Sequence, residues 1–252
     1  MGGTSIKSNM REKSLLAMNA EINVEDLLKT MWELDSDTKR TLTNEEQLCE
    51  DFYKNTYTRN AEGRYVVRLP FKKGGLNIPE GNSRDIALKR LMQLERRFDK
   101  NLELKEEYTK VIEEYKDLGH MEEVPIEERG RKSVYLPHHA VIRQDKETTK
   151  TRIVFDASSK TSHGVSLNDE LLPGPVLQDD LRNLIMRWRG HAVCFVSNIQ
   201  KMYRMILIHP EDADYQRILW RSDPSDEIRD YRLLTVTFGT ASAPYLAIRT
   251  LK

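Results

Sequence analysis

The chain is organised around the stretch Cys194-Phe195-Val196-Ser197-Asn198-Ile199-Gln200-Lys201-Met202-Tyr203-Arg204-Met205-Ile206-Leu207-Ile208. It contains two short apolar runs separated by a brief polar interruption, and His209-Pro210 follows the second run. Runs of this length and content are typical of buried strands. We therefore predict two strands with a kink between them, and a short polar residue, Asn198, at the tip of the first.

Composition limits the class of protein. Of 252 residues, 38% are hydrophobic and 32% charged, which is enough for a core beneath a charged surface. The 40 basic and 40 acidic side chains cancel, so any surface for nucleic acid has to be local. Cys49 and Cys194 give no disulfide framework, and no apolar run is long enough to span a membrane. We expect an intracellular protein, cytoplasmic or nuclear, without a membrane partner.

The first third of the chain reads as helices and linkers. Residues 1–20 lack any period, and we predict that they are disordered. Residues 21–83 are predicted to form a helical and linker segment, with helical spacing over 24–34, a capping box at Thr43 and Glu46, and a β-rich stretch over 64–71.

Two amphipathic helices are predicted next, over about 83–100 and 104–118. Their charged faces are expected to be mainly solvated surface. The basic residues that could contact phosphate are Lys89, Arg90, Arg96 and Arg97.

Strands dominate the second half. Residues 135–143 and 150–156 flank a polar turn and predict a hairpin. The adjacent His138 and His139 do not predict a metal site, because neighbouring strand residues point to opposite faces and no further ligand lies at suitable spacing. A helix over about 179–190, a strand pair over 216–221 and 231–238, and a last helix after 239–244 complete the prediction.

Six motifs occur along the chain in a recognisable order. They are Tyr65-Val66-Val67-Arg68-Leu69-Pro70, Leu118-Gly119-His120-Met121-Glu122, Tyr135-Leu136-Pro137-His138-His139-Ala140-Val141, Arg152-Ile153-Val154-Phe155-Asp156-Ala157-Ser158, Lys201-Met202-Tyr203-Arg204 and Thr237-Phe238-Gly239-Thr240-Ala241-Ser242-Ala243-Pro244. In these motifs the chain, from about residue 27 to its end, resembles the Pol polyprotein of BEL/Pao-type LTR retrotransposons. The resemblance covers the linker between protease and reverse transcriptase and the first half of the reverse transcriptase.

The resemblance implies an α+β fold, a partial right-hand polymerase preceded by a mainly helical N-terminal segment. Residues 84–195 would be the fingers and 196–252 a truncated palm. Its partners would be an RNA or DNA template-primer and a deoxynucleoside triphosphate.

The resemblance also assigns site residues. Arg152 stands where reverse transcriptases grip the triphosphate, with Arg143 or Lys146 as a second cation, because guanidinium groups bond phosphate oxygens in pairs. Tyr203 matches the aromatic gate under the sugar. The residues that bound the nucleotide pocket are Phe238 and Gly239, and those expected along the nucleic acid are Lys150, Pro244, Lys89 and Arg96.

The catalytic carboxylates are altered. Relatives read Asp-Ile-Glu-Lys-Met-Tyr-Arg where this chain has Asn198 and Gln200, and the Tyr-x-Asp-Asp motif that supplies further ligands is absent from the sequence given. Magnesium prefers carboxylate oxygens, and polymerases need two such ions. We therefore predict no intact catalytic site and no bound cofactor, although an intact relative would use Mg²⁺.

Four hypotheses follow. The first is a catalytically inactive reverse transcriptase fragment. The second is part of a longer, active Pol polyprotein whose reading frame continues beyond Lys252. The third is a residual nucleic-acid-binding module. The fourth is a fragment that does not fold stably, because the palm sheet would lack strands to cover its apolar runs.

Overall fold

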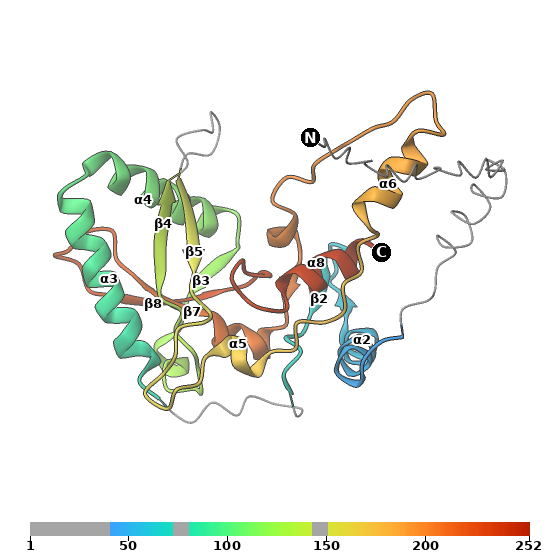
Figure 1. Cartoon of the computed structure of the whole chain (residues 1–252). Coiled ribbons are helices and arrows are strands. Elements are labelled where there is room, and N and C mark those ends of the chain that lie inside the picture. The colour runs from blue at the N-terminus through green and yellow to red at the C-terminus, as the bar shows by residue number, and fades with distance from the viewer. Residues whose placement is uncertain (1–40, 73–80, 143–150) are drawn as a thin grey trace, which may run out of the picture. The chain divides into compact units, whose positions relative to one another are not determined.

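Small sheets and the helices around them make up the computed structural model, which describes residues 41–72, 81–142 and 151–252 (Figure 1). Within that part the fold class is α+β, as predicted. Residues 42–252 cluster as one unit. The predicted disorder of residues 1–20 and helix over 24–34, together with Arg143, Lys146 and Lys150, lie outside the described residues.

Six of the described strands form two three-stranded sheets. The first has the order β1-β2-β6, and the second the order β3-β8-β7. The strands are β1 (Thr58–Arg59), β2 (Tyr65–Val67), β3 (Met121–Glu123), β6 (Leu207–Ile208), β7 (Arg217–Trp220) and β8 (Arg229–Leu233). The N–H of Ile208 donates to Leu234 O at 2.9 Å and the N–H of Val236 donates to Ile206 O at 3.0 Å, so β6 is bonded to the residues that follow β8.

The predicted hairpin is confirmed as β4 (His138–Ile142) and β5 (Thr151–Phe155), an antiparallel pair in which Ala140 lies opposite Ile153. Its side chains alternate as expected for a sheet with one buried face. His138 is buried and His139 is exposed, which confirms that the two histidines point to opposite faces.

Two helices pack on this hairpin and on β7 (Figure 1). They are α3 (Ser83–Asp99) and α4 (Leu102–Asp117), close to the predicted ranges. An aromatic core forms between them, with the Tyr108 ring 5.2 Å from Phe98 and 5.4 Å from Trp220. The Tyr108 hydroxyl and His138 Nδ1 lie 2.5 Å apart, and His138 Nε2 lies 2.9 Å from Leu219 O.

The segment before α3 packs against the end of the chain. Helix α2 (Asn44–Thr56) starts with the predicted capping box at Thr43 and Glu46 and contacts helix α8 (Ala243–Leu251). Glu50 accepts hydrogen bonds from the Tyr245 hydroxyl at 2.8 Å and from Arg249 Nε at 2.7 Å. Burial alone would raise the pKa of Glu50, but these hydrogen bonds and the charge of Arg249 lower it below its ordinary value.

Short elements fill the connections. These are the helices α5 (Leu167–Glu170), α6 (Leu181–Trp188) and α7 (Pro210–Ala213), and the 3-10 turns η2 (Ile126–Glu128), η3 (Met202–Met205) and η4 (Asp214–Gln216). None of the described helices is both long enough and apolar enough to cross a membrane.

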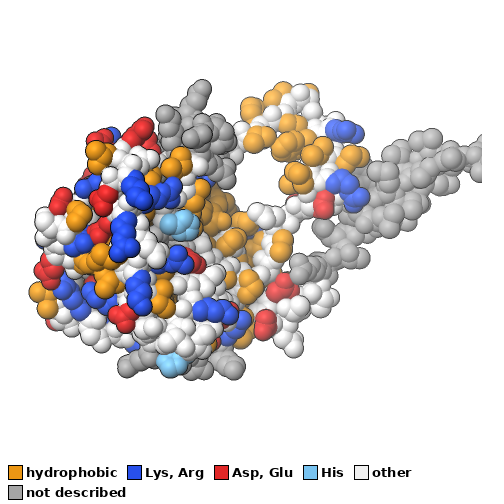
Figure 2. Space-filling view, turned by 60° about the vertical axis from the view of Figure 1, so that its left-hand side comes forward, with side chains coloured by type: hydrophobic (Ala, Val, Ile, Leu, Met, Phe, Trp, Pro, Cys, Tyr) orange, Lys and Arg blue, Asp and Glu red, His pale blue; other side chains and the backbone are white. Residues whose placement is uncertain are grey.

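The strand predicted over residues 194–199 is wrong. Residues 193–199 have no regular secondary structure, and within the described residues 193–198 make no backbone-to-backbone hydrogen bond. Phe195 is 86% exposed and Val196 is 80% exposed. A strand needs a neighbouring strand to accept its backbone hydrogen bonds, and nothing described lies alongside this one. Helix α6, directly before it, also buries no residue, and Figure 2 shows apolar side chains gathered over this region.

Candidate functional site

Two aromatic residues, 35 positions apart in sequence, form the centre of the candidate site. The Tyr203 ring, on η3, stacks on the Phe238 ring, with centroids 4.1 Å apart and an interplanar angle of 29°. Phe238 is 48% exposed and Tyr203 is half-buried. Burial raises the pKa of the Tyr203 hydroxyl, which therefore stays protonated at neutral pH. We call these two residues the aromatic pair.

Gly239 brings the end of strand β5 against the aromatic pair. Its φ of +107° favours glycine, and a Cβ at this position would lie 2.1 Å from Phe155 O. No other residue fits without moving the backbone. Arg152 lies three residues before Phe155 on β5, which places it about 10 Å along the strand from this contact.

Asn168, on the short helix α5, binds to the same turn. Its Nδ2 donates to Gly239 O at 2.9 Å, and its Oδ1 accepts from the N–H of Ala241 at 2.8 Å. Sequence reasoning gave this residue no role, because a Ser, Gly and Asn-rich loop predicts only a turn. Pro244, which was predicted to lie along the nucleic acid, is in the first turn of α8 and is exposed.

The turn that carries Tyr203 begins in an unusual conformation. Lys201 has φ +54°, and among the described residues it is the one non-glycine residue with positive φ. This left-handed conformation costs about 1–2 kcal/mol for a residue with a side chain. Lys201 Nζ lies 2.9 Å from Glu114 Oε1, on helix α4.

Glu114 also binds the residue after Tyr203. Arg204 NH2 lies 2.5 Å from Glu114 Oε1, and its guanidinium stands 4.5 Å over the Tyr115 ring. Arg64 donates to Arg204 O at 3.1 Å. Burial would raise the pKa of Glu114, but the hydrogen bonds from Lys201 and Arg204 lower it, so it is ionised at neutral pH.

His120 lies close to this group of charges. It is 5% exposed, and among the described residues its Nδ1 has no hydrogen-bond partner. Burial lowers its pKa to about 4, the positive charges of Arg204, Arg64 and Lys201 act in the same direction, and Glu114 opposes them. His120 is therefore neutral at neutral pH.

Arg152 and the basic residues of α3 are exposed. Arg152 lies on the open face of the hairpin, opposite Val141, and forms no ion pair within the described part of the chain. The same holds for the exposed α3 residues Lys89, Arg90, Arg96 and Arg97. Figure 2 shows several Lys and Arg side chains close together on the face of the molecule that is turned toward the viewer. Arg143 and Lys150, also predicted as phosphate contacts, lie outside the described residues.

Asn198 is not placed at the tip of a strand. It is exposed on residues 193–199, and among the described residues no group of three His, Cys, Asp or Glu side chains could hold a metal ion. At position 198 a magnesium ion would meet an amide oxygen, which brings no negative charge.

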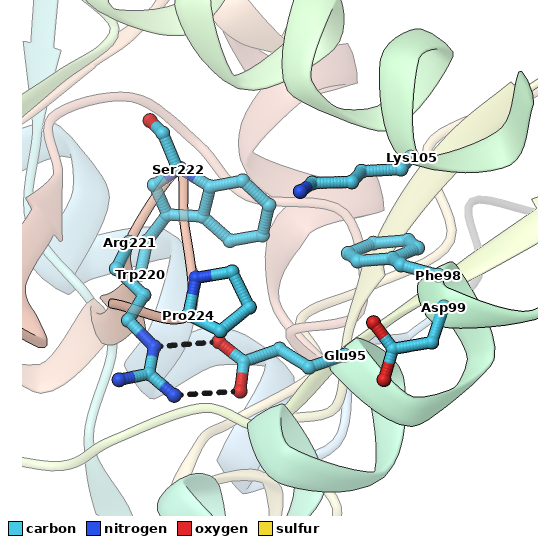
Figure 3. Close-up of a pocket in the computed structure, with 8 residues that line it drawn as sticks. All are labelled: Glu95, Phe98, Asp99, Lys105, Trp220, Arg221, Ser222 and Pro224. Atoms are coloured by element: carbon cyan, nitrogen blue, oxygen red, sulfur yellow. Dashed lines mark hydrogen bonds and ion pairs between the residues drawn. The ribbon is translucent and has the colours of Figure 1, made fainter. Parts of the chain in front are cut away.

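A small hollow between α3 and β7 is lined by none of the residues of the candidate site (Figure 3). Arg221 closes it with two hydrogen bonds to Glu95, at 2.7 and 2.9 Å. Trp220 Nε1, buried beside it, has no partner in the described residues. The hollow has room for about one water molecule, which is too little for a nucleotide.

No protein-family model matches the chain, and no curated protein matches it.

Of the predicted site residues, Tyr203, Phe238 and Gly239 lie together. Arg152 lies on β5, the strand whose last residue, Phe155, contacts Gly239. It does not bring Asn198 to a metal site, and it leaves Lys89 and Arg96 on the surface of α3.

Proposed function

We propose that this chain derives from a reverse transcriptase of the BEL/Pao type and keeps a nucleotide-facing surface without the ability to synthesise DNA. The observation that carries the proposal is the aromatic pair. The resemblance assigned Tyr203 and Phe238 to one nucleotide pocket, and the two rings stack at 4.1 Å. The resemblance made that assignment from sequence motifs alone, so the contact between the two rings is an independent observation.

The arrangement suits a sugar and its phosphates. An exposed aromatic face can pack under a deoxyribose ring, and a ring in that position excludes a 2′-hydroxyl by its bulk. Arg152, exposed and without an ion-pair partner in the described chain, can bind phosphate oxygens through two N–H groups. Gly239 allows a close approach of backbone and ligand.

Asn198 is the reason to expect no polymerisation. Phosphoryl transfer between nucleotides requires divalent ions held by carboxylates, and an amide cannot neutralise them. A loss of about 4 kcal/mol of charge stabilisation corresponds to a rate decrease of roughly a thousandfold.

Two measurements test the proposal. In the first, dTTP binding by the purified chain is measured by calorimetry, and Tyr203→Ala should weaken it about tenfold. Tyr57→Ala is the control, since Tyr57 is an exposed tyrosine that stacks on Tyr53 and has no ring contact with Tyr203 or Phe238 among the described residues. Equal affinity of the Tyr203→Ala variant and the unaltered chain would contradict the assignment.

In the second, primer extension is measured with a primed RNA template and Mg²⁺. We expect no product above a protein-free control. Mg²⁺-dependent extension by the unaltered chain would overturn the proposed inactivity.

A second candidate function is nucleic-acid binding by α3. Its support is the set of exposed cations on that helix that lack ion pairs within the described residues. Binding through phosphate contacts weakens linearly in log salt, and each lost contact lowers the slope by about one. We expect that change in a mobility-shift assay for Lys89→Gln and Arg96→Gln. Arg131→Gln is the control, because exposed Arg131 is paired with Glu128 at 3.1 Å.

A further inference from the structure

We propose that Glu114, on helix α4, is a positioning residue that holds the turn of residues 201–205 in the conformation that presents Tyr203 to Phe238. This inference rests on the proposed function, since it concerns the same aromatic pair. Neither the motifs nor the resemblance singles out Glu114.

The contacts of Glu114 lie on both sides of Tyr203 in sequence. Its Oε1 accepts from Lys201 Nζ at 2.9 Å, two residues before Tyr203, and from Arg204 NH2 at 2.5 Å, one residue after it. A single carboxylate therefore fixes both ends of the turn. Both partners are charged, and charge-assisted hydrogen bonds of this length are the strong ones.

The turn needs such a restraint because of its backbone. Lys201 has φ +54°, a conformation that a lysine rarely adopts unless the surroundings impose it. The side chain of this strained residue is one of the two that bind Glu114. Releasing that bond lets Lys201 return to an extended or right-handed conformation, which would turn residues 202–205 away from Phe238.

The opposite end of the turn is held by independent contacts. The Arg204 guanidinium is stacked over Tyr115, the neighbour of Glu114 on α4, at 4.5 Å. Arg64 donates to the backbone oxygen of Arg204 at 3.1 Å. Helix α4 thus supplies a rigid surface on which Arg204 rests, and Glu114 supplies the directional bond.

The substitution Glu114→Gln should change the affinity for a triphosphate in opposite directions, depending on whether Glu114 acts by positioning the turn or only through its charge. Glu114 is an anion close to the aromatic pair, so removing its charge without moving the turn would strengthen the binding of a triphosphate. If Glu114 acts by holding the turn, removing the charge weakens binding instead. Glu114→Gln keeps the size of the side chain and changes only its charge and bonding.

The experiment uses the full chain with dTTP as the probe, together with hydrogen–deuterium exchange of the peptide covering residues 199–206. We expect Glu114→Gln to weaken dTTP binding about tenfold and to speed exchange in that peptide. Glu113→Gln is the control: Glu113 neighbours Glu114 on α4 and pairs with Lys116 of the same helix at 3.0 Å. It should change both readouts less than about twofold. Since Glu114 is 42% exposed, neither variant is expected to unfold the chain.

A double-mutant cycle tests whether Glu114 acts through Lys201. Lys201→Gly removes both the ammonium group that binds Glu114 and the strain of the positive φ, so in that background the turn no longer depends on Glu114 to the same degree. We expect Glu114→Gln to speed exchange clearly less in that background than in the unaltered chain. An equal effect in both backgrounds would show that Glu114 does not act through the strained residue, and would overturn the inference.

The two measurements, dTTP binding and hydrogen–deuterium exchange, distinguish failure of the positioning role from failure of the proposed function. Unchanged or tighter dTTP binding by Glu114→Gln, with unchanged exchange, overturns the positioning role while leaving the proposed function intact. If the unaltered chain does not bind dTTP, the proposed function fails, and exchange alone then decides: faster exchange in Glu114→Gln but not in Glu113→Gln supports the positioning role, and equal exchange overturns it.

Discussion

The hairpin β4–β5 and residues 193–199 are similar in apolar content and different in structure. Both were predicted as strands from short apolar runs. In the hairpin, five residues of each strand are paired and Phe155 is buried. In residues 193–199, Phe195 is 86% exposed and the backbone has no strand beside it within the described residues.

The difference shows which part of strand formation is local. An alternation of apolar and polar residues, and a high content of β-branched residues, describe side chains that would fit a half-buried surface. Pairing depends on a second strand at the right place, which a single run of sequence does not reveal. In the hairpin, β4 has that partner in β5.

The largest expected contrast is in cysteine reactivity. Cys49 is fully buried on α2, and burial, followed by the negative charge of Glu50, raises its pKa to about 12. Cys194 is exposed in residues 193–199. Because thiolate and access are both required, a thiol reagent should label Cys194 at least about a thousandfold faster than Cys49. Mass spectrometry of partly labelled protein measures this, and comparable rates would mean that residues 193–199 are covered in solution.

A phenylalanine pair gives the next effect. Phe155→Ala should lower the free energy of unfolding by about 3–5 kcal/mol, because it leaves a cavity in the core. Phe195→Ala should change it by less than about 0.5 kcal/mol, since the ring is mostly in solvent already. Urea unfolding of both variants provides the measurement. A large loss for Phe195→Ala would show that this ring packs against something.

A histidine pair predicts the pH dependence. Burial lowers the pKa of His138 from 6.5 to about 4, although its backbone hydrogen bond to Leu219 opposes the shift. The unfolded chain then binds more protons between these values, so stability is fully present above about pH 6.5 and falls as the pH drops toward 4. For His138 the loss is roughly 3 kcal/mol.

Unfolding in urea between pH 4 and 7.5 checks this sign. His138→Asn should make the profile shallower by removing one buried imidazole, while His120, whose pKa burial also lowers to about 4, still contributes. His191→Gln, at an exposed position just before residues 193–199, should leave the profile unchanged. A profile for His138→Asn as steep as that of the unaltered chain would exclude His138 as its source.

A glycine pair gives the smallest effect. Gly239→Ala should cost about 2 kcal/mol, because the new methyl group meets Phe155 O at 2.1 Å and φ is +107°. Gly190→Ala, before the exposed segment, meets only Arg187 O at an ordinary 3.4 Å and should be nearly neutral. Thermal unfolding distinguishes the two variants. Equal midpoints would mean that the Gly239 turn relaxes easily.

Local patterns predicted the elements that need few distant contacts. The capping box at Thr43, the amphipathic spacing of α3 and α4, and the alternation of the hairpin are all properties of neighbouring residues, and all are present in the structure. The strand over 194–199 was wrong because pairing is not a local property.

The candidate site divides in the same way. Tyr203, Phe238 and Gly239 were identified because they belong to motifs. Glu114 and Asn168 were not, because their importance comes from bonds to residues 90 and 71 positions away. A charged residue on a helix, or an asparagine in a loop, carries no signal of such a distant partner in its own sequence context.

The packing of α2 on α8 has a practical consequence for recombinant work. A shorter version that begins near residue 84 would lack Glu50 and leave the Tyr245 hydroxyl and Arg249 without this acceptor. It would also lack β2, the parallel neighbour of β6. Expression boundaries should therefore retain α2 and β2.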